Sequence, residues 1–307
     1  MPKVSICIPA YNQANLLKKT IDSVLVQTFN DYEIIITDDS SNNFVKDLVS
    51  SFNTTDKIKY FRNKIPLGSP ENWNEGIRNA KGDYIKILHH DDRFFDKNSL
   101  AKYVALLDEN PKIDFAFSAT INEFSDEERR EHLITTEQLN ELRNNSLLLF
   151  CNNIIGAPSN TILRKNSKLI FDNRLKWLVD IEFYIGSLTN DKGFVYTSEM
   201  LSVTHNGSER VTNTCEGNIK VEIFEYFYVF WKIYSQRKNY KKEALVKCIN
   251  KIISICNQYN ITSLKEVKDI GYSGNIPYHI KVYLFTKRLN PFLSKLFLAI
   301  LRRNLLF

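Results

Sequence analysis

Short apolar runs and amphipathic segments alternate along the first ninety residues of the chain. The apolar runs have the length of strands buried in a parallel sheet and cover residues 4–8, 32–37, 58–61 and 84–88. Between them, apolar residues recur at helical spacing over residues 16–29, 44–52 and 73–80. Because every connection is long enough to hold a helix, the pattern predicts parallel strands joined by right-handed crossovers.

The alternation continues less regularly over the rest of the chain. It predicts helices near residues 98–108 and 180–188, and strands over residues 113–119, 159–164 and 195–203. Residues 123–146 are polar and charged, which indicates a surface excursion with some helix. From Asn218 onward, aromatic side chains crowd one helix and lysines dominate the next. We therefore predict an α/β body over residues 1–217 and a helical C-terminal region over 218–307.

Charge separates these two parts. The whole chain has a net charge of +6, but residues 218–307 hold 16 Lys and Arg against 5 Asp and Glu, a balance of +11. The first 217 residues hold the remaining 25 against 30, a balance of −5. No nucleic-acid motif accompanies the basic region. Two interpretations stay open: peripheral contact with an anionic membrane, and helices that pack on the body with solvated lysines.

Composition and cysteine usage predict a cytoplasmic globular protein. Hydrophobic residues make up 43% of the chain, enough for a sizeable core. The five cysteines are odd in number and form no C-x-x-C pair, which favours reduced thiols. The start, M-P-K-V-S-I-C-I-P, enters a strand without the features of a secretory signal, and no run of about 18 apolar residues suggests a membrane span.

Polar loops follow each of the first four predicted strands, at the edge where open α/β sheets bind ligands. The strand at 84–88 leads into His89, His90, Asp91 and Asp92. Adjacent carboxylates repel each other, which indicates a cation or a donor-rich ligand nearby. A solvated turn that caps the following helix is the alternative.

Four motifs in order resemble family 2 glycosyltransferases of the GT-A fold. They are V-S-I-C-I-P-A-Y-N at the first strand, T-D-D-S-S at the second, N-x-x-x-G-S-x-x-N-x-x-x-x-x-A-x-G-D-Y-I, and the D-D pair. The resemblance covers roughly residues 3–210. It implies a Rossmann-like, mostly parallel sheet with helices on both faces, a nucleotide-sugar half near 1–112, an acceptor half near 113–217, and the helical extension.

The resemblance implies a divalent cation, Mn²⁺ or Mg²⁺, at the fourth strand. Asp92 matches the direct metal ligand, and Asp91 matches the residue that orients the ribose or sugar and binds metal through water. His89 stands where many relatives have a third acidic residue, so metal affinity is expected to be weaker. His89 is either a ligand or a structural histidine.

The resemblance also places the nucleotide. Asp39 matches the carboxylate that hydrogen-bonds the base, and Pro9, Ala10, Tyr11 and Asn12 match the loop that cradles it. Tyr11 could stack on the base or sit at the rim of the core. Asn63 and Asn72 match positions near the nucleotide, although Asn72 also suits a helix start.

The acceptor side follows in the same way. Asp180 matches the catalytic base, with Val179 in place of a second acidic residue, and a plain helix cap is its alternative. Residues 156–158 match the acceptor-side loop. His205 matches a third metal ligand or phosphate contact, and Arg210 a contact to the diphosphate; both are otherwise ordinary loop residues.

These matches predict an inverting, metal-dependent glycosyltransferase. We expect its donor to be a nucleotide-diphosphate sugar, with a UDP sugar as the first candidate. We expect its acceptor to be a glycan or a lipid-linked glycan in the synthesis of a bacterial surface polysaccharide. The first loop has no glycine, which excludes the G-x-G loops of nucleotidyltransferases and dehydrogenases. A non-catalytic module that binds nucleotide sugars or glycans remains the alternative.

Overall fold

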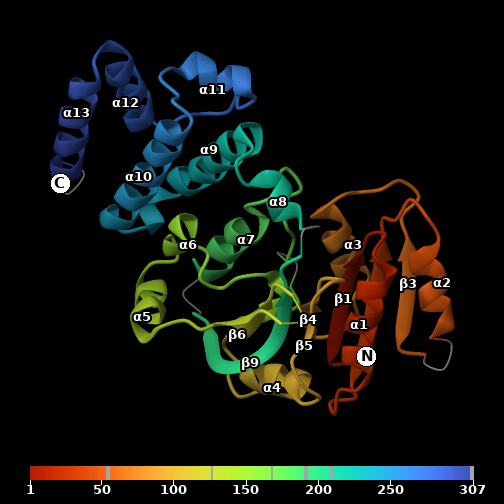
Figure 1. Ribbon diagram of the computed structural model, residues 1–307. Helices are drawn as coiled ribbons and strands as arrows, with labels where there is room; N and C mark the ends of the chain where they lie inside the picture. The colour runs from red at the N-terminus through yellow and green to blue at the C-terminus, as the bar shows by residue number, and fades with distance from the viewer. Residues whose placement is uncertain (53–55, 126, 167–168, 190–192, 208–209, 305–307) are drawn as a thin grey trace. The chain divides into compact units, whose positions relative to one another are not determined.

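The structure is a computed structural model that describes residues 1–307 except 53–55, 126, 167–168, 190–192, 208–209 and 305–307. The chain divides into two compact units (Figure 1). The first comprises residues 1–139, 154–174 and 186–208, and the second comprises 140–153, 175–185 and 209–307. Residues 140–153 and 175–185, which the sequence analysis assigned to the α/β body, thus belong with the C-terminal helices.

One mixed sheet organises the first unit. Its strands in the described chain are β1 (Val4–Ala10), β2 (Tyr32–Asp38), β3 (Ile58–Arg62), β4 (Tyr84–Ile87), β5 (Arg93–Phe94), β6 (Phe115–Glu123), β7 (Arg129–His132), β8 (Thr161–Arg164) and β9 (Val195–His205). Their order is β3-β2-β1-β4-β8-β6-β9-β5, with β7 beside β6. The predicted parallel run of β3, β2, β1 and β4 is confirmed. Beyond it, β8 runs antiparallel to both β4 and β6, and β6 pairs with β9 in parallel.

Helices cover both faces of this sheet, as predicted. They are α1 (Ala14–Leu25), α2 (Phe44–Ser51), α3 (Glu71–Asn79) and α4 (Ser99–Asp108), while α5 (Thr136–Asn144) and α7 (Val179–Leu188) contribute residues to both units. Alternate residues of β1 point to opposite faces. Val4, Ile6 and Ile8 pack in one core with α1 and α4. Cys7 faces the other way, where α3 approaches so closely that a Cβ at Gly76 would lie 3.3 Å from the Cβ of Cys7.

The turn into β4 requires glycine. A Cβ at Gly82 would lie 2.5 Å from the backbone nitrogen of Ser5, which leaves no room for a side chain. The Ser5 hydroxyl accepts hydrogen bonds from the backbone N–H groups of Lys81 and Gly82 and donates to Glu33. These contacts place β4, and the acidic loop after it, beside β1.

Helices build the second unit. They include α6 (Leu148–Cys151), α8 (Val211–Cys215), α9 (Ile219–Ser235), α10 (Lys242–Gln258), α11 (Leu264–Ile270), α12 (Tyr278–Leu289) and α13 (Pro291–Asn304). Of the two short 3-10 helices, η1 (Pro158–Asn160) belongs to the first unit and η2 (Arg237–Asn239) to the second. The aromatic helix of the sequence analysis is α9, and Ile223, Phe227 and Phe230 on it are fully buried. Tyr226 is buried as well, so the inner side of this helix forms core, while Phe224, Tyr228, Trp231 and Tyr234 keep part of their surface exposed.

A buried carboxylate on α9 fixes the start of α7. Glu225 is 2% exposed and accepts hydrogen bonds from the backbone N–H groups of Lys176, Trp177 and Leu178, at 2.7, 3.0 and 2.7 Å. Burial raises the pKa of Glu225, and the three N–H groups oppose that shift. Because those N–H groups have this carboxylate as their acceptor, the segment that leads to Asp180 depends on it.

We expect Glu225→Ala to lower the free energy of unfolding of the second unit by about 3 kcal/mol, because three buried N–H groups lose their acceptor. Glu225→Gln keeps one acceptor oxygen and should lose less. Thermal unfolding of both variants measures the effect. Glu243→Ala on the exposed start of α10 is the control, and an equal loss in that variant would contradict this role for Glu225.

Candidate functional site

The loop after β1 is anchored to the loop after β2. Asn12 adopts a left-handed backbone conformation with φ of 56°, which asparagine tolerates better than most residues. Its side-chain oxygen accepts hydrogen bonds from the backbone N–H and hydroxyl of Ser41 and from the Asn42 amide. Asn12 therefore shapes the predicted base-binding loop. Pro9 and Ala10 end β1, and Tyr11 at the turn is 54% exposed and available to a ligand.

Asp39, Asn63 and Asn72 form one hydrogen-bonded group at the carboxyl ends of β1, β2 and β3. The Asn63 amide donates to Asp39 at 2.6 Å and to the side-chain oxygen of Asn72 at 2.9 Å. Asp39 also accepts from the backbone N–H groups of Leu67 and Gly68. Buried Asn72 donates to the backbone oxygen of Thr37. Their interactions with each other order the loop over residues 63–68; their role toward a nucleotide stays a prediction.

Asp91, Asp92 and His89 form a cluster after β4. One ligand atom from each lies within 4.8 Å of the others. Asp92 is 2% exposed and accepts a hydrogen bond of 2.9 Å from the backbone N–H of His205 at the end of β9. The Nδ1 atom of His89 lies 3.8 Å from Oδ2 of Asp92, and the His89 ring packs against Trp73. His205 thus contributes its backbone to the cluster, and its ring lies beside it.

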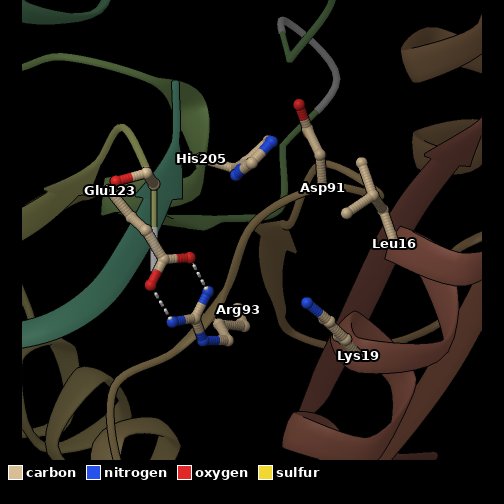
Figure 2. A pocket seen from close by; sticks show the side chains of 7 residues that line it. Leu16, Lys19, Asp91, Arg93, Glu123 and His205 are labelled. Atoms are coloured by element: carbon tan, nitrogen blue, oxygen red, sulfur yellow. Dashed lines mark hydrogen bonds and ion pairs between the residues drawn. The ribbon is translucent and has the colours of Figure 1, made fainter. Parts of the chain in front are cut away.

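The cluster borders a cavity of about 300 Å³ (Figure 2). Its lining residues are Leu16, Lys19, Asp91, Arg93, Glu123, Ser125 and His205. The guanidinium of Arg93 forms two hydrogen bonds of 2.7 Å with the Glu123 carboxylate. A polar ligand next to Asp91 would therefore find hydrogen-bond donors and acceptors on the Arg93–Glu123 pair, on Lys19 and on the imidazole of His205.

A polar stripe on α1 holds the acidic loop from the other side. The Thr20 hydroxyl lies 2.8 Å from the backbone oxygen of His90 and 2.7 Å from that of Asp92. One helical turn on, Ser23 accepts from the backbone N–H of Phe94. Gln27 then donates to the backbone oxygen of Asp96. The sequence analysis missed this stripe, although buried polar residues at helical spacing, three and four apart, are its signal.

Lys86 lies beneath the cluster, fully buried on β4. Its ammonium donates to the backbone oxygens of Ser159 and Thr161 and lies 4.0 Å from the centroid of the Tyr103 ring. Burial lowers the pKa of Lys86 well below its ordinary value, and the charge of Asp92 opposes that shift. The sequence analysis did not single out this residue, because a lysine in an apolar strand is usually exposed to solvent at the edge of a sheet.

Asp180 belongs to the second unit, in the first turn of α7. Its carboxylate accepts from the Asn153 amide at 2.8 Å and from the backbone N–H of Ile181 at 2.9 Å. The residue keeps part of its surface exposed, yet the protein packed around the carboxyl raises its pKa to about 6. The hydrogen bonds and the positive charge of Arg210 oppose that rise. Asp180 and Arg210 are thus neighbours within this unit.

The family comparison agrees with this geometry. The model of glycosyl transferase family 2 matches residues 5–168, more than half of the chain, and the chain belongs to that family. The predicted resemblance is confirmed at this level.

Curated relatives match parts of the chain. An uncharacterized glycosyltransferase of Rickettsia felis is 39% identical over 118 residues, 38% of this chain and 19% of that protein. The GalNAc(5)-diNAcBac-PP-undecaprenol beta-1,3-glucosyltransferase of Campylobacter jejuni is 39% identical over 94 residues, 30% of each protein. The chain thus spans less than a third of these relatives.

Solved structures share the fold over nearly the whole chain. S. aureus TarS 1-349 in complex with UDP-GlcNAc has a TM-score of 0.68 at 16% identity, covering 99% of this chain and 86% of that one. The mannosyltransferase PcManGT from Pyrobaculum calidifontis, in complex with GDP-Man and Mn²⁺, has a TM-score of 0.57 at 12% identity, covering 100% and 87%. The predicted GT-A fold is confirmed.

The cluster fits a divalent cation. Two carboxylates supply hard oxygen ligands of the kind that Mn²⁺ and Mg²⁺ prefer, and His89 supplies one imidazole nitrogen within the same reach. The buried Asp92 carboxylate keeps one oxygen on His205 and the other toward His89, so its orientation is fixed before a cation binds. Asp91, Asp92 and His89 are the residues that would hold the ion.

We expect Thr20→Val to weaken Mn²⁺ binding about tenfold, because losing the hydroxyl releases the backbone on both sides of Asp91 and outer contacts of this kind orient metal ligands. Titration calorimetry of the full chain with Mn²⁺ measures this. Thr28→Val is the matched control, since Thr28 hydrogen-bonds residues 97 and 98 outside the cluster. Equal affinities in the two variants would show that the Thr20 hydroxyl does not orient the cluster.

Proposed function

We propose that this chain transfers a sugar, with inversion, from a nucleotide-diphosphate donor to a hydroxyl of a glycan or lipid-linked acceptor. The main observation behind this proposal is the cluster of His89, Asp91 and Asp92 beside a polar cavity, in a chain that belongs to family 2. TarS with UDP-GlcNAc supports a UDP sugar as donor. The lipid-linked substrate in the Campylobacter relative's name supports a lipid-linked acceptor. Our proposal includes a cell-surface glycan as the product, made at the cytoplasmic face of the membrane.

Donor binding involves the first unit. A cation held by Asp91, Asp92 and His89, Mn²⁺ or Mg²⁺, would neutralise charge on the departing nucleoside diphosphate. PcManGT with GDP-Man and Mn²⁺ supports this assignment. Tyr11 stacks on the base, while Asn12, Asn63 and Asn72 hold the loops around it and Asp39 accepts from its edge. His205 contacts a phosphate from the end of β9.

Proton removal falls to Asp180. An acceptor hydroxyl becomes a nucleophile as its proton passes to a carboxylate, and a carboxyl with a pKa of about 6 is ionised at neutral pH while remaining a better base than an ordinary aspartate. The Asn153 amide and the Ile181 N–H orient the carboxylate. The positive charge of Arg210 stabilises its ionised form.

A non-catalytic module that binds nucleotide sugars is the second candidate. The substitutions at His89 and Val179, which depart from the acidic pattern of many relatives, favour it. Metal-dependent UDP binding without transfer or donor hydrolysis over a panel of acceptors would select this candidate over the enzyme.

We expect Asp92→Asn to reduce metal-dependent hydrolysis or transfer of the donor at least about a hundredfold, because the buried carboxylate is a proposed ligand. EDTA should abolish wild-type turnover, and added Mn²⁺ should restore it. The exposed Asp31→Asn is the control variant. Near wild-type turnover by Asp92→Asn would refute the proposed metal role.

Asp180 should set the acidic limb of the pH profile. Below about pH 6 its carboxyl is protonated and cannot accept a proton, so kcat should fall tenfold per pH unit there and level off above. Asp180→Asn should lower kcat at least about a hundredfold with donor binding unchanged. Glu182→Gln, which alters a neighbouring carboxylate ion-paired with Lys232, is the control. A flat wild-type profile down to pH 4.5 would argue against this base.

A further inference from the structure

Large apolar side chains are exposed on α12 and α13, two consecutive helices of the second unit. On α12, Tyr278, Phe285 and Leu289 are 71%, 64% and 62% exposed, and on α13, Phe292 is 70% exposed. Leu293 and Leu296 extend the face along α13. We call these six side chains the hairpin face. Large apolar side chains gathered in this way mark an interaction surface.

The opposite side of α12 attaches this helix to the rest of the second unit. Ile280, Tyr283 and Leu284 of α12 are buried. Lys287 donates to the backbone oxygens of Cys256 and Ile261 and to the Asn257 side chain. The inner side of α12 is therefore packed and hydrogen-bonded within the unit, while its outer side presents the hairpin face.

Basic residues accompany the hairpin face along the sequence. Residues 270–307 contain six basic residues and no Asp or Glu: Lys281, Lys287, Arg288, Lys295, Arg302 and Arg303. Lys281 and Arg288 are exposed on the same turns of α12 as Tyr278, Phe285 and Leu289. Exposed aromatic and leucine side chains beside lysine and arginine are the composition of helices that lie in a membrane interface.

We infer that the hairpin face docks onto an anionic lipid surface. No helix in the described ranges is long and apolar enough to cross a bilayer. A second copy of this chain is a poorer occupant, because a symmetric contact would bring the exposed Lys281 and Arg288 of both copies to one interface. The inference rests on the proposed function, because docking would hold the enzyme at the membrane where a lipid-linked acceptor lies. Binding to lipid can still be measured without any turnover.

Co-sedimentation of the full chain with phosphatidylcholine vesicles, with and without 30% phosphatidylglycerol, tests this inference. The wild type should bind the anionic vesicles and bind the neutral ones weakly. Phe285→Ser with Phe292→Ser should lower the partition coefficient at least about tenfold, because two exposed phenyl rings no longer enter the interface. Lys281→Glu with Arg288→Glu should lower it similarly at low salt, and salt should weaken wild-type binding.

Phe44→Ser with Val26→Ser is the matched control, because these side chains are 65% and 63% exposed in the first unit. Equal losses in the control and hairpin variants, or no wild-type binding to anionic vesicles, would overturn the inference. A wild-type dimer in solution that the hairpin variants dissociate would overturn it too, in favour of a second copy. UDP binding with Mn²⁺, measured on the same variants without lipid, should be unchanged, so a failure of the donor site is seen separately.

Discussion

The structure around the candidate donor site depends on burying the Asp92 carboxylate. A buried carboxylate is costly unless hydrogen bonds and opposite charge compensate it. Here the carboxylate accepts the His205 N–H at the end of β9 and feels the charge of Lys86 on β4. The Thr20 hydroxyl of α1 donates to the backbone oxygen of the same residue, so β9 and α1 are both joined to the acidic loop. The side chain that would hold a cation is thus oriented by the fold itself.

Sequence patterns predict the strand ends but not the groups that fix them. The apolar runs predicted β1 to β4 in a parallel order, and Asp39 and Asn63, which follow β2 and β3, meet Asn72 at the start of α3. Lys86 and Glu225 could not be found in this way, and the spacing of Thr20, Ser23 and Gln27 marks a polar stripe without identifying what it binds. Their partners are mostly backbone oxygens and N–H groups 47 to 75 residues away along the chain, and periodicity contains no information about such contacts.

The C-terminal region shows why composition alone could not locate an interaction surface. Its most aromatic segment, α9, buries Tyr226, Phe227 and Phe230 in its own unit, whereas α12 and α13 expose phenylalanine and leucine. An aromatic stripe at helical spacing suits a core as well as an interface. Only the burial of the side chains on each helix distinguishes the two, and it favours residues 278–296 over α9 as the proposed lipid surface.

Two carboxyls in the second unit have pKa values raised by burial, and their surroundings assign them different roles. Glu225 is almost inaccessible, and its oxygens are taken up by three backbone N–H groups, so it can only hold structure. Asp180 keeps exposed surface, and its carboxylate accepts hydrogen bonds from the Asn153 amide and the Ile181 N–H, with a cationic side chain nearby. A base must be reachable as well as basic. The carboxylate on α9 therefore positions the segment that leads to α7, and under the proposed function Asp180, which keeps exposed surface, is the base for an acceptor hydroxyl.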